Sequence, residues 1–291
     1  MPVHSLLILP EMEGRSIRSI ALGAIGMSSG QFKRAKFQGQ ILLDGIRVTA
    51  DVRVRAGQQL TLHVPDIEGS HPEALHIPLH IVYEDDFLLV IDKPAPLPSA
   101  PSTRRDTPTL ENALFAHLGC PERFVYRPVN RLDKGTSGLM IVAKDAHAQY
   151  LLQNMLHTSD FIREYLAVVE GCPPDDEGLI DLPIAKADGP TVRREVRPDG
   201  KEARTFYRVI QKGARSLVRL RLDTGRTHQI RVHMAHHGCP VTGDFLYGTE
   251  IAALPGRFAL HSAMITLRHP VTGRQLTLES DLPPQLNAFL D

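Results

Sequence analysis

The chain has 291 residues, of which 42% are hydrophobic and 23% are charged, as is usual for a soluble globular protein. No apolar run approaches the roughly 20 residues of a membrane-spanning helix, and the short apolar run at residues 5–10 lacks the basic leader of a signal peptide. The three cysteines, Cys120, Cys172 and Cys239, lie far apart without a C-x-x-C pair. This spacing argues against a disulfide framework, so we expect a protein of the reducing cytoplasm.

The charges of the chain balance, because 33 Lys and Arg face 33 Asp and Glu. The balance conceals blocks of opposite sign. Residues 1–65 carry a net charge of +4 and residues 191–240 one of +8, whereas residues 66–100 carry −6 and residues 166–190 carry −5. Basic blocks are one footprint of a nucleic-acid-binding protein, but solvated faces of an ordinary surface give the same pattern. Charge alone leaves both interpretations open, and if the partner is a nucleic acid, we expect the acidic blocks to face away from it.

The first 65 residues predict a small unit of two helices on a small sheet. A helix within residues 12–27 precedes Ser28, which is a suitable N-cap for a second, short helix. Residues 40–48 then give a strand, an Asp-Gly turn and a second strand, and residues 58–64 give another strand. The prolines and glycine of residues 66–78 are typical of a linker.

The rest of the chain mixes hairpins with helices and therefore predicts the α+β class with a largely antiparallel sheet. We expect strands at residues 81–83, 87–91, 139–143 and 165–169, helices at 109–119 and 145–157, and a loop over the five prolines of residues 94–108. Residues 216–222 alternate, with Val218, Leu220 and Leu222 on one face. A helix at residues 227–237 would have Thr227 as its N-cap and Gly238 at its end.

A candidate for chemistry is the acidic residue in NRLDKGTSG, residues 130–138. Asp133 has the cations Arg131 and Lys134 beside it, which favour an ionised carboxylate. An ionised Asp on a loop suits a nucleophile or a base, although the same pattern suits a surface loop with a local ion pair. The residues alone leave both interpretations open.

A second candidate is GRTHQIRVH, residues 225–233, where Arg226 and Arg231 lie near the start of a predicted helix. Helix starts favour anions, and arginine binds carboxylate or phosphate through two hydrogen bonds. The alternative is a basic helix end on the surface.

A third candidate is the group of histidines that follows this motif. His228, His233, His236 and His237 lie close in sequence to Cys239, and His233 and His237 have the i, i+4 spacing of some metal sites. No acidic residue lies between those two, so we predict no metal site. The chain also has no glycine-rich nucleotide motif and no G-x-S-x-G elbow, so we predict no cofactor.

Taken together, four segments resemble the RluA-type pseudouridine synthases in the order that is usual for that family. They are similar to its opening strand pair, to its signature around a catalytic Asp, to its strand with an active-site Tyr and to its third conserved block. The segments are IVYEDDFLLVIDKP at 81–94, RLDKGTSGLMIVAK at 131–144, EYLAVVEG at 164–171 and GRTHQIRVHMAHHGCPVTGDFLYG at 225–248. Residues 12–65 resemble, more loosely, a small RNA-binding domain shared with a ribosomal protein.

The resemblance implies a pseudouridine synthase fold, with a mixed, largely antiparallel sheet flanked by helices and a small helix-plus-sheet domain before it. It divides the chain into an RNA-binding domain at 1–65, a linker at 66–78 and a catalytic domain at 79–291. It also implies an isomerase that converts uridines of structured ribosomal or transfer RNA to pseudouridine. We expect a monomer that acts without a cofactor and away from membranes.

The resemblance also implies roles for individual residues. Asp133 would be the catalytic carboxylate, Arg231 its partner, and Tyr165 would stack on the target base. Arg131 would fill the space that a flipped nucleotide leaves in the RNA. Whether the carboxylate attacks the sugar or the base stays open for this family. Further RNA contacts are expected at Asn130, Lys33, Arg34, Lys36, Arg226 and His228.

The chain departs from the family pattern at two places around the RNA-facing loop. Asn130 stands where the family usually has His, and Ala95-Pro96 replaces the usual x-Gly after Lys93-Pro94. Both changes concern substrate choice more than chemistry. A catalytically silent RNA-binding protein on the same scaffold and a metal-dependent hydrolase are the alternatives. The complete set of Asp133, Tyr165 and Arg231 favours the enzyme.

Overall fold

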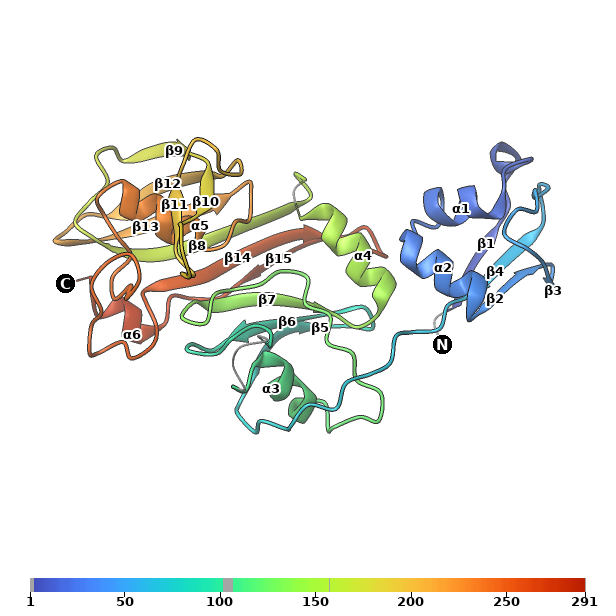
Figure 1. Cartoon of the computed structure of the whole chain (residues 1–291), viewed down its shortest axis with the longest axis horizontal. Helices are drawn as coiled ribbons and strands as arrows, with labels where there is room; N and C mark the ends of the chain where they lie inside the picture. Colours follow the sequence, from blue (N-terminus) through green and yellow to red (C-terminus); the bar gives the residue numbers. More distant parts are fainter. Residues whose placement is uncertain (1–2, 102–106, 157, 291) are drawn as a thin grey trace.

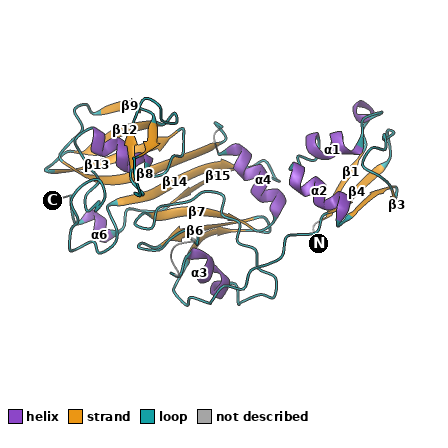
Figure 2. Ribbon diagram, viewed as in Figure 1, coloured by secondary structure: helices purple, strands orange, loops and turns teal. Residues whose placement is uncertain are grey.

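The structure is a computed structural model that describes residues 3–101, 107–156 and 158–290. It holds a large mixed sheet with helices around it and a separate small antiparallel sheet with two helices of its own (Figures 1 and 2). The predicted α+β class is therefore confirmed.

The small unit is built on a four-stranded antiparallel sheet. In spatial order its strands are β1 (Val3–Leu7), β4 (Gln59–His63), β2 (Gln40–Leu43) and β3 (Ile46–Arg47). Helices α1 (Ile17–Gly23) and α2 (Ser29–Phe37) complete the unit, which has its own cluster of buried apolar side chains. Asp44 and Gly45 form the turn between β2 and β3 with φ values of 51° and 78°. Aspartate and glycine tolerate such values, which the tight turn of a hairpin requires.

Local signals account for most of this unit. Ser28 Oγ accepts a hydrogen bond from Gln31 N, and Ser28 N donates one to Gln31 Oε1, so the predicted N-cap is a full capping box. The expected helix at residues 12–27 is shorter than predicted. A 3-10 turn, Pro10–Met12, comes first, and α1 begins only after Ser16, which caps it. Strand β1 was not predicted, and residues 64–79 contain neither helix nor strand.

The large sheet brings together strands from the whole remainder of the chain. In spatial order they are β5 (His80–Glu84), β6 (Leu88–Lys93), β7 (Ser137–Ala143), β14 (Leu260–Arg268), β8 (Phe161–Glu170), β13 (Arg215–Leu222), β12 (Arg204–Gln211) and β9 (Glu177–Asp181). β7 and β14 run parallel, and the other pairings between these strands are antiparallel. β15 (Gln275–Glu279) pairs with β14, and β10 (Ile184–Lys186) and β11 (Arg194–Val196) form a separate hairpin.

The helices of this part of the chain are α3 (Leu110–His117), α4 (Ala146–Met155), α5 (Gln229–His236) and α6 (Pro284–Asn287). Thr109 and Asp145 cap α3 and α4 with their side chains. α4 packs on β7, whereas α5 packs on β11 and β12. In the described part of the predicted loop at 94–108 there is no helix or strand, while residues 102–106 lie outside the described residues, as does His157 of the predicted helix at 145–157.

The parallel junction between β7 and β14 places the candidate loop. Gly138 has a φ of +103°, and a Cβ atom built there would lie 2.3 Å from Ser262 O. Only glycine therefore allows the two backbones to approach so closely. Residues 130–136 lead into β7, and the segment before residue 260 leads into β14. Because β7 and β14 are parallel neighbours, these two segments lie side by side.

Candidate active site

Residues 130–134 and residues 225–227, which precede α5, line one cleft of about 730 Å³. Tyr165 of β8 lines the same cleft, as do Arg131, Asp133 and Arg226. The structure thus brings together residues from three of the four segments that carried the resemblance.

Asp133 and Arg231 are in direct contact. Arg231 Nη1 donates to Asp133 Oδ2 at 2.9 Å, across 98 residues of sequence. The Arg231 side chain is 3% exposed and that of Asp133 is 27% exposed. A buried cation therefore holds a carboxylate that still faces the cleft.

Asp244 fixes Arg231 from the other side. Arg231 Nε and Nη2 donate to its two carboxylate oxygens at 2.6 and 2.8 Å, and Asp244 is fully buried. The guanidinium also lies over the Phe258 ring, 4.1 Å from its centroid. Burial opposes the charge of Arg231, but the hydrogen bonds to Asp244 raise its pKa above the ordinary value. Arg231 is thus a fixed cation that presents Nη1 to Asp133.

Asp244 was missed by the sequence interpretation, although it lies inside the quoted segment at 225–248. A signal for it existed. Between Arg231 and Thr249 it is the only acidic residue, and a buried arginine needs acceptors for the N–H groups that a single carboxylate leaves unpaired.

The proline-rich segment supports the loop of Asp133. Ser99 Oγ donates to Leu132 O at 2.6 Å and accepts from Leu132 N at 3.0 Å, and Leu97 N donates to Lys134 O at 3.0 Å. Gly135 packs so tightly that a Cβ atom there would lie 2.6 Å from a Phe258 ring carbon. The residues around Asp133 are therefore held on both sides.

Lys93, the last residue of β6, binds the backbone of the proline-rich segment. Its side chain is fully buried, and Nζ donates to Pro94 O at 2.9 Å and to Leu97 O at 2.8 Å. Burial lowers the pKa of Lys93 to about 7, although the negative charge of Asp133 acts in the opposite direction. The departure from the family pattern after Pro94 is thus accommodated by side-chain and backbone contacts.

Tyr165 lies at the floor of the cleft, paired across β8 with Leu220 of β13 and Ser262 of β14. Burial raises the pKa of its phenol, so the ring is neutral near pH 7. Asn130 is buried, and its Oδ1 accepts from Ile141 N at 2.8 Å, so its side chain ties the loop to β7. Arg131 is exposed at the rim, while Arg226 Nε donates to Glu202 O at 2.8 Å.

The start of α5 differs from the prediction. His228, not Thr227, is the N-cap, and it has a left-handed φ of 59° and makes no side-chain cap bond. The side chain of Gln229, the first residue of α5, binds the segment before the helix. Its Oε1 accepts from Arg226 N and from Thr224 Oγ1, each at 2.9 Å. His228 Nδ1 lies 2.8 Å from the Tyr247 hydroxyl, and Nε2 lies 3.9 Å from Asp133 Oδ2.

The buried histidine of the predicted group, His233, forms hydrogen bonds to protein atoms on both ring nitrogens. His233 Nε2 donates to Leu182 O and Nδ1 accepts from Thr205 Oγ1, both at 2.9 Å, so this ring ties α5 to its neighbours. His236 is exposed. In the part of the chain that the structure describes, no three His, Cys, Asp or Glu side chains gather as a metal ion would require.

The strongly basic block at 191–240 lies against the acidic block that precedes it. Because β9 pairs with β12 and β8 with β13, acidic and basic side chains meet across the strands. The resulting ion pairs are Arg208–Glu177 at 2.9 Å, Arg219–Glu164 at 3.2 Å and Arg215–Glu170 at 3.1 Å. The acidic block at 166–190 is therefore not segregated from the basic one in space, contrary to a simple interpretation of the sequence blocks.

The predicted cations of the small unit lie on α2. Lys33 and Lys36 are exposed, while Arg34 is half-buried and its Nε donates to Pro65 O at 3.1 Å. Figure 1 shows α2 beyond α4, at the end of the molecule away from α5. The structure does not bring these residues to the cleft of Asp133.

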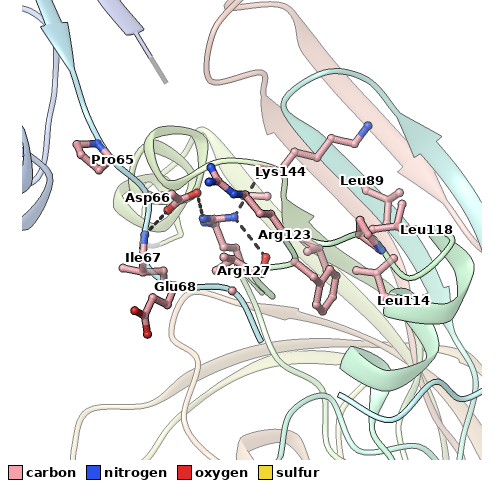
Figure 3. Close-up of a pocket in the computed structure, with 16 residues that line it drawn as sticks. Pro65, Asp66, Ile67, Glu68, Leu89, Leu114, Leu118, Arg123, Arg127 and Lys144 are labelled. Carbon is pink, nitrogen blue, oxygen red and sulfur yellow. Dashed lines mark hydrogen bonds and ion pairs between the residues drawn. The ribbon is translucent and has the colours of Figure 1, made fainter. Parts of the chain in front are cut away.

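A second cavity, of about 840 Å³, lies where the segment at 65–69 crosses the large unit (Figure 3). Arg127 forms an ion pair with Asp66 there and donates to Val125 O and Lys144 O at 3.3 Å each. None of the predicted site residues lines this cavity.

Comparisons with known proteins agree with the geometry. A family model described as RNA pseudouridylate synthase matches residues 87–236. "Uncharacterized RNA pseudouridine synthase YlyB" of Bacillus subtilis strain 168 is 37% identical, over 87% of this chain and 85% of that protein. "Ribosomal large subunit pseudouridine synthase D" of Xanthomonas campestris pv. campestris is 38% identical, over 87% of this chain and 80% of that protein.

A solved structure gives the same result. "Human RNA Pseudouridylate Synthase Domain Containing 1" is similar in fold, with a TM-score of 0.60 and 25% identity, over 72% of this chain and 87% of that one. The chain belongs to the RNA pseudouridylate synthase family, and it is an isomerase that acts on RNA. No helix among the described residues has the length and apolar character that would let it span a membrane.

Proposed function

We propose that Asp133 is the catalytic carboxylate of this pseudouridine synthase, that Arg231 holds it in place, and that Tyr165 lies against the target uracil. The observation that supports this most directly is the chain of contacts from Asp244 through Arg231 to Asp133 at the floor of the cleft. A fixed cation orients the carboxylate before the substrate arrives, which lowers the reorganisation that the reaction needs.

The reaction needs little else from the protein. The bond between C1′ and N1 of the uridine breaks, a bond between C1′ and C5 forms, the hydrogen leaves C5, and N1 gains a proton. Nothing is oxidised or reduced, so no cofactor is required. A base must leave the RNA stack to reach Asp133, at a cost of a few kcal/mol. Stacking on the Tyr165 ring would return about 1–3 kcal/mol of that.

We further propose that the substrate is a structured RNA, with large-subunit ribosomal RNA as the first candidate and transfer RNA as the second. The first candidate is supported by relatives named ribosomal large subunit pseudouridine synthase in Xanthomonas and Vibrio. The small unit, residues 1–65, would bind RNA phosphates through Lys33, Arg34 and Lys36, and residues 66–78 would link it to the catalytic domain at 79–291. Arg131, Asn130, Arg226 and His228 would lie along the bound RNA. The protein would act in the cytoplasm as a monomer.

Asp133→Asn tests the assignment, because asparagine keeps the shape of the side chain and removes its charge. RNA labelled with tritium at uracil C5 releases that tritium to water when C5 forms its new bond, so turnover is measured directly. We expect the rate to fall by about 1,000-fold or more, as for the loss of other essential catalytic groups, with RNA affinity nearly unchanged. Large-subunit ribosomal RNA and bulk transfer RNA, both from cells that lack the gene, serve as the two substrates.

Asp223→Asn is the matched control, because Asp223 is exposed and forms no ion pair within the described residues. It should turn over at the rate of the unmodified protein. Near-normal tritium release by Asp133→Asn would show that another group carries the reaction.

A further inference from the structure

His228 is held in an unusual backbone conformation directly beside Asp133. Its φ of 59° lies in the left-handed region, which residues with a Cβ atom seldom adopt, and such positions occur preferentially at functional sites. The side chain is 13% exposed, and Nε2 lies 3.9 Å from Asp133 Oδ2. This distance is longer than a hydrogen bond, but contacts of this kind often tighten only when substrate is bound.

The hydrogen-bond partners of the His228 ring favour one of its two neutral tautomers. Arg194 N donates to the Tyr247 hydroxyl at 2.8 Å, so this oxygen already serves as an acceptor. The hydroxyl hydrogen is then free to go to His228 Nδ1, also at 2.8 Å. With Nδ1 as the acceptor, the neutral ring carries its hydrogen on Nε2, on the side of Asp133.

The same buried carboxylate organises both groups that approach Asp133. Asp244 binds Arg231 through two hydrogen bonds and also accepts from Tyr247 N at 3.2 Å. Arg231 Nη1 and His228 Nε2 both approach Oδ2 of Asp133. Among the described residues, none donates a hydrogen bond to Oδ1. The two oxygens of Asp133 therefore differ, because both groups approach Oδ2 and neither donates to Oδ1.

We propose that His228 is a positioning residue for the reaction, whose Nε2–H closes onto Asp133 Oδ2 when RNA fills the cleft and so presents Oδ1 to the target nucleotide. This inference rests on the proposed function of Asp133. It gives Tyr247 a defined task as well, because its hydroxyl selects the tautomer that His228 needs.

The electrostatic surroundings favour the neutral ring. Burial lowers the pKa of His228 below its usual value, and this effect outweighs the attraction of the nearby acids. The charged groups that face the ring are Asp133, Arg231, Asp244 and Arg194. Near pH 7 the histidine therefore acts as a hydrogen-bond donor without adding a second charge beside Arg231.

His228→Asn is the sharpest test, because asparagine tolerates the left-handed conformation and the backbone can stay as it is. With the enzyme in excess over C5-labelled RNA, we expect the single-turnover rate of tritium release to fall by about 10- to 100-fold. The dissociation constant for the same RNA should change far less than the rate, and the melting temperature should stay unchanged. The RNA is whichever of ribosomal and transfer RNA supports turnover by the unmodified full chain.

Tyr247→Phe keeps the ring and removes only the hydroxyl. Its rate should fall several-fold, and the double variant with His228→Asn should be no slower than His228→Asn alone, because Tyr247 acts through His228. His236→Asn, a change of an exposed histidine on the same helix, is the control and should leave the rate unchanged.

Four outcomes would overturn the proposal. An unchanged rate in His228→Asn shows that the ring is not needed, and weaker RNA binding at an unchanged rate shows a simple RNA contact. A rate loss that follows a lower melting temperature shows a packing role, and additive losses in the double variant separate Tyr247 from His228. Asp133→Asn is measured alongside. If Asp133→Asn stays active, the proposed function itself fails. If Asp133→Asn is inactive and one of the four outcomes is observed, only the proposed role of His228 is refuted.

Discussion

The two basic blocks of the chain have very different surroundings. In residues 191–240, Arg208, Arg215 and Arg219 each have one acidic partner within 4.0 Å, Arg204 and Arg231 each have two, and Arg197 has three. In the small unit, Lys33 and Lys36 are exposed on α2, and neither forms an ion pair with a described residue. Among the described residues, five of the twelve basic side chains of 191–240 form no ion pair, whereas all eight basic side chains of 1–65 form none. The block with the higher net charge therefore offers fewer unpaired cations to a polyanion.

Strand pairing accounts for this difference. The acids of residues 166–190 and the arginines that follow lie on strands that become neighbours, so charges that are separate in sequence meet across the sheet. On α2, by contrast, no acidic side chain of the described residues forms an ion pair with Lys33 or Lys36. The net charge of a sequence segment thus does not show which of its cations are unpaired in space. That depends on the fold, and only unpaired cations are available to RNA phosphates.

The largest effect is expected where the pairing is most buried. Arg231→Met leaves Asp244 buried without its cation, which should cost about 3–5 kcal/mol in the free energy of unfolding, because an uncompensated buried charge is unfavourable. The rate of tritium release should fall by about 1,000-fold, since Asp133 also loses its partner. Urea unfolding and the C5-tritium assay measure the two effects.

Arg231→Met combined with Asp244→Leu separates stability from catalysis. Removing both charges should restore part of the lost stability but none of the activity. Substantial turnover by either variant would mean that the pairing serves the fold alone.

An intermediate effect is expected in the small unit. Replacing both Lys33 and Lys36 by alanine removes two unpaired cations, so fewer counterions are released when RNA binds. The slope of the logarithm of affinity against the logarithm of salt concentration should become shallower by about 1 to 2. Filter binding of the same RNA at several salt concentrations provides the slope, and the rate at saturating RNA should not change. An unaltered slope would place the RNA elsewhere on the protein.

The smallest effect is expected in the paired block. Arg208→Ala removes an exposed arginine whose charge Glu177 already balances, so we expect the salt slope to stay the same. The free energy of unfolding should change by less than about 1 kcal/mol, as is usual for exposed ion pairs. If the salt slope instead falls as it does for the lysines of α2, the contrast between the two blocks is wrong.

Features set by neighbouring residues were predictable from the sequence. The capping box at Ser28, the turn at Asp44-Gly45 and the alternation of residues 216–222 depend on a few adjacent side chains. In β13, Val218, Leu220 and Leu222 are buried and Arg219 and Arg221 are exposed, as expected. The predicted N-cap of α5 was wrong, because His228 takes that position and Gln229 N donates to Arg226 O, not to the side chain of Thr227.

Features set by distant residues were harder to predict. β14 was not predicted as a strand, and it pairs with β7 and β8 on its two sides. The contact between Asp133 and Arg231 was expected only through the resemblance to a family, since nothing local joins residues so far apart. Asp244 and the ion pairs across β8, β9, β12 and β13 depend on strand register and on a buried contact, which composition does not reveal.

The position of β14 also determines the order in which the protein is assembled on the ribosome. This strand lies between β7 and β8 but is synthesised after both, and Phe258, which packs against Gly135 and Arg231, is made just before it. The small unit, with its own buried cluster, is complete much earlier and can fold first. A nascent chain therefore displays the exposed lysines of α2 before the contacts that support its cleft are complete. With the roles proposed above, the chain would contact RNA before it could modify it.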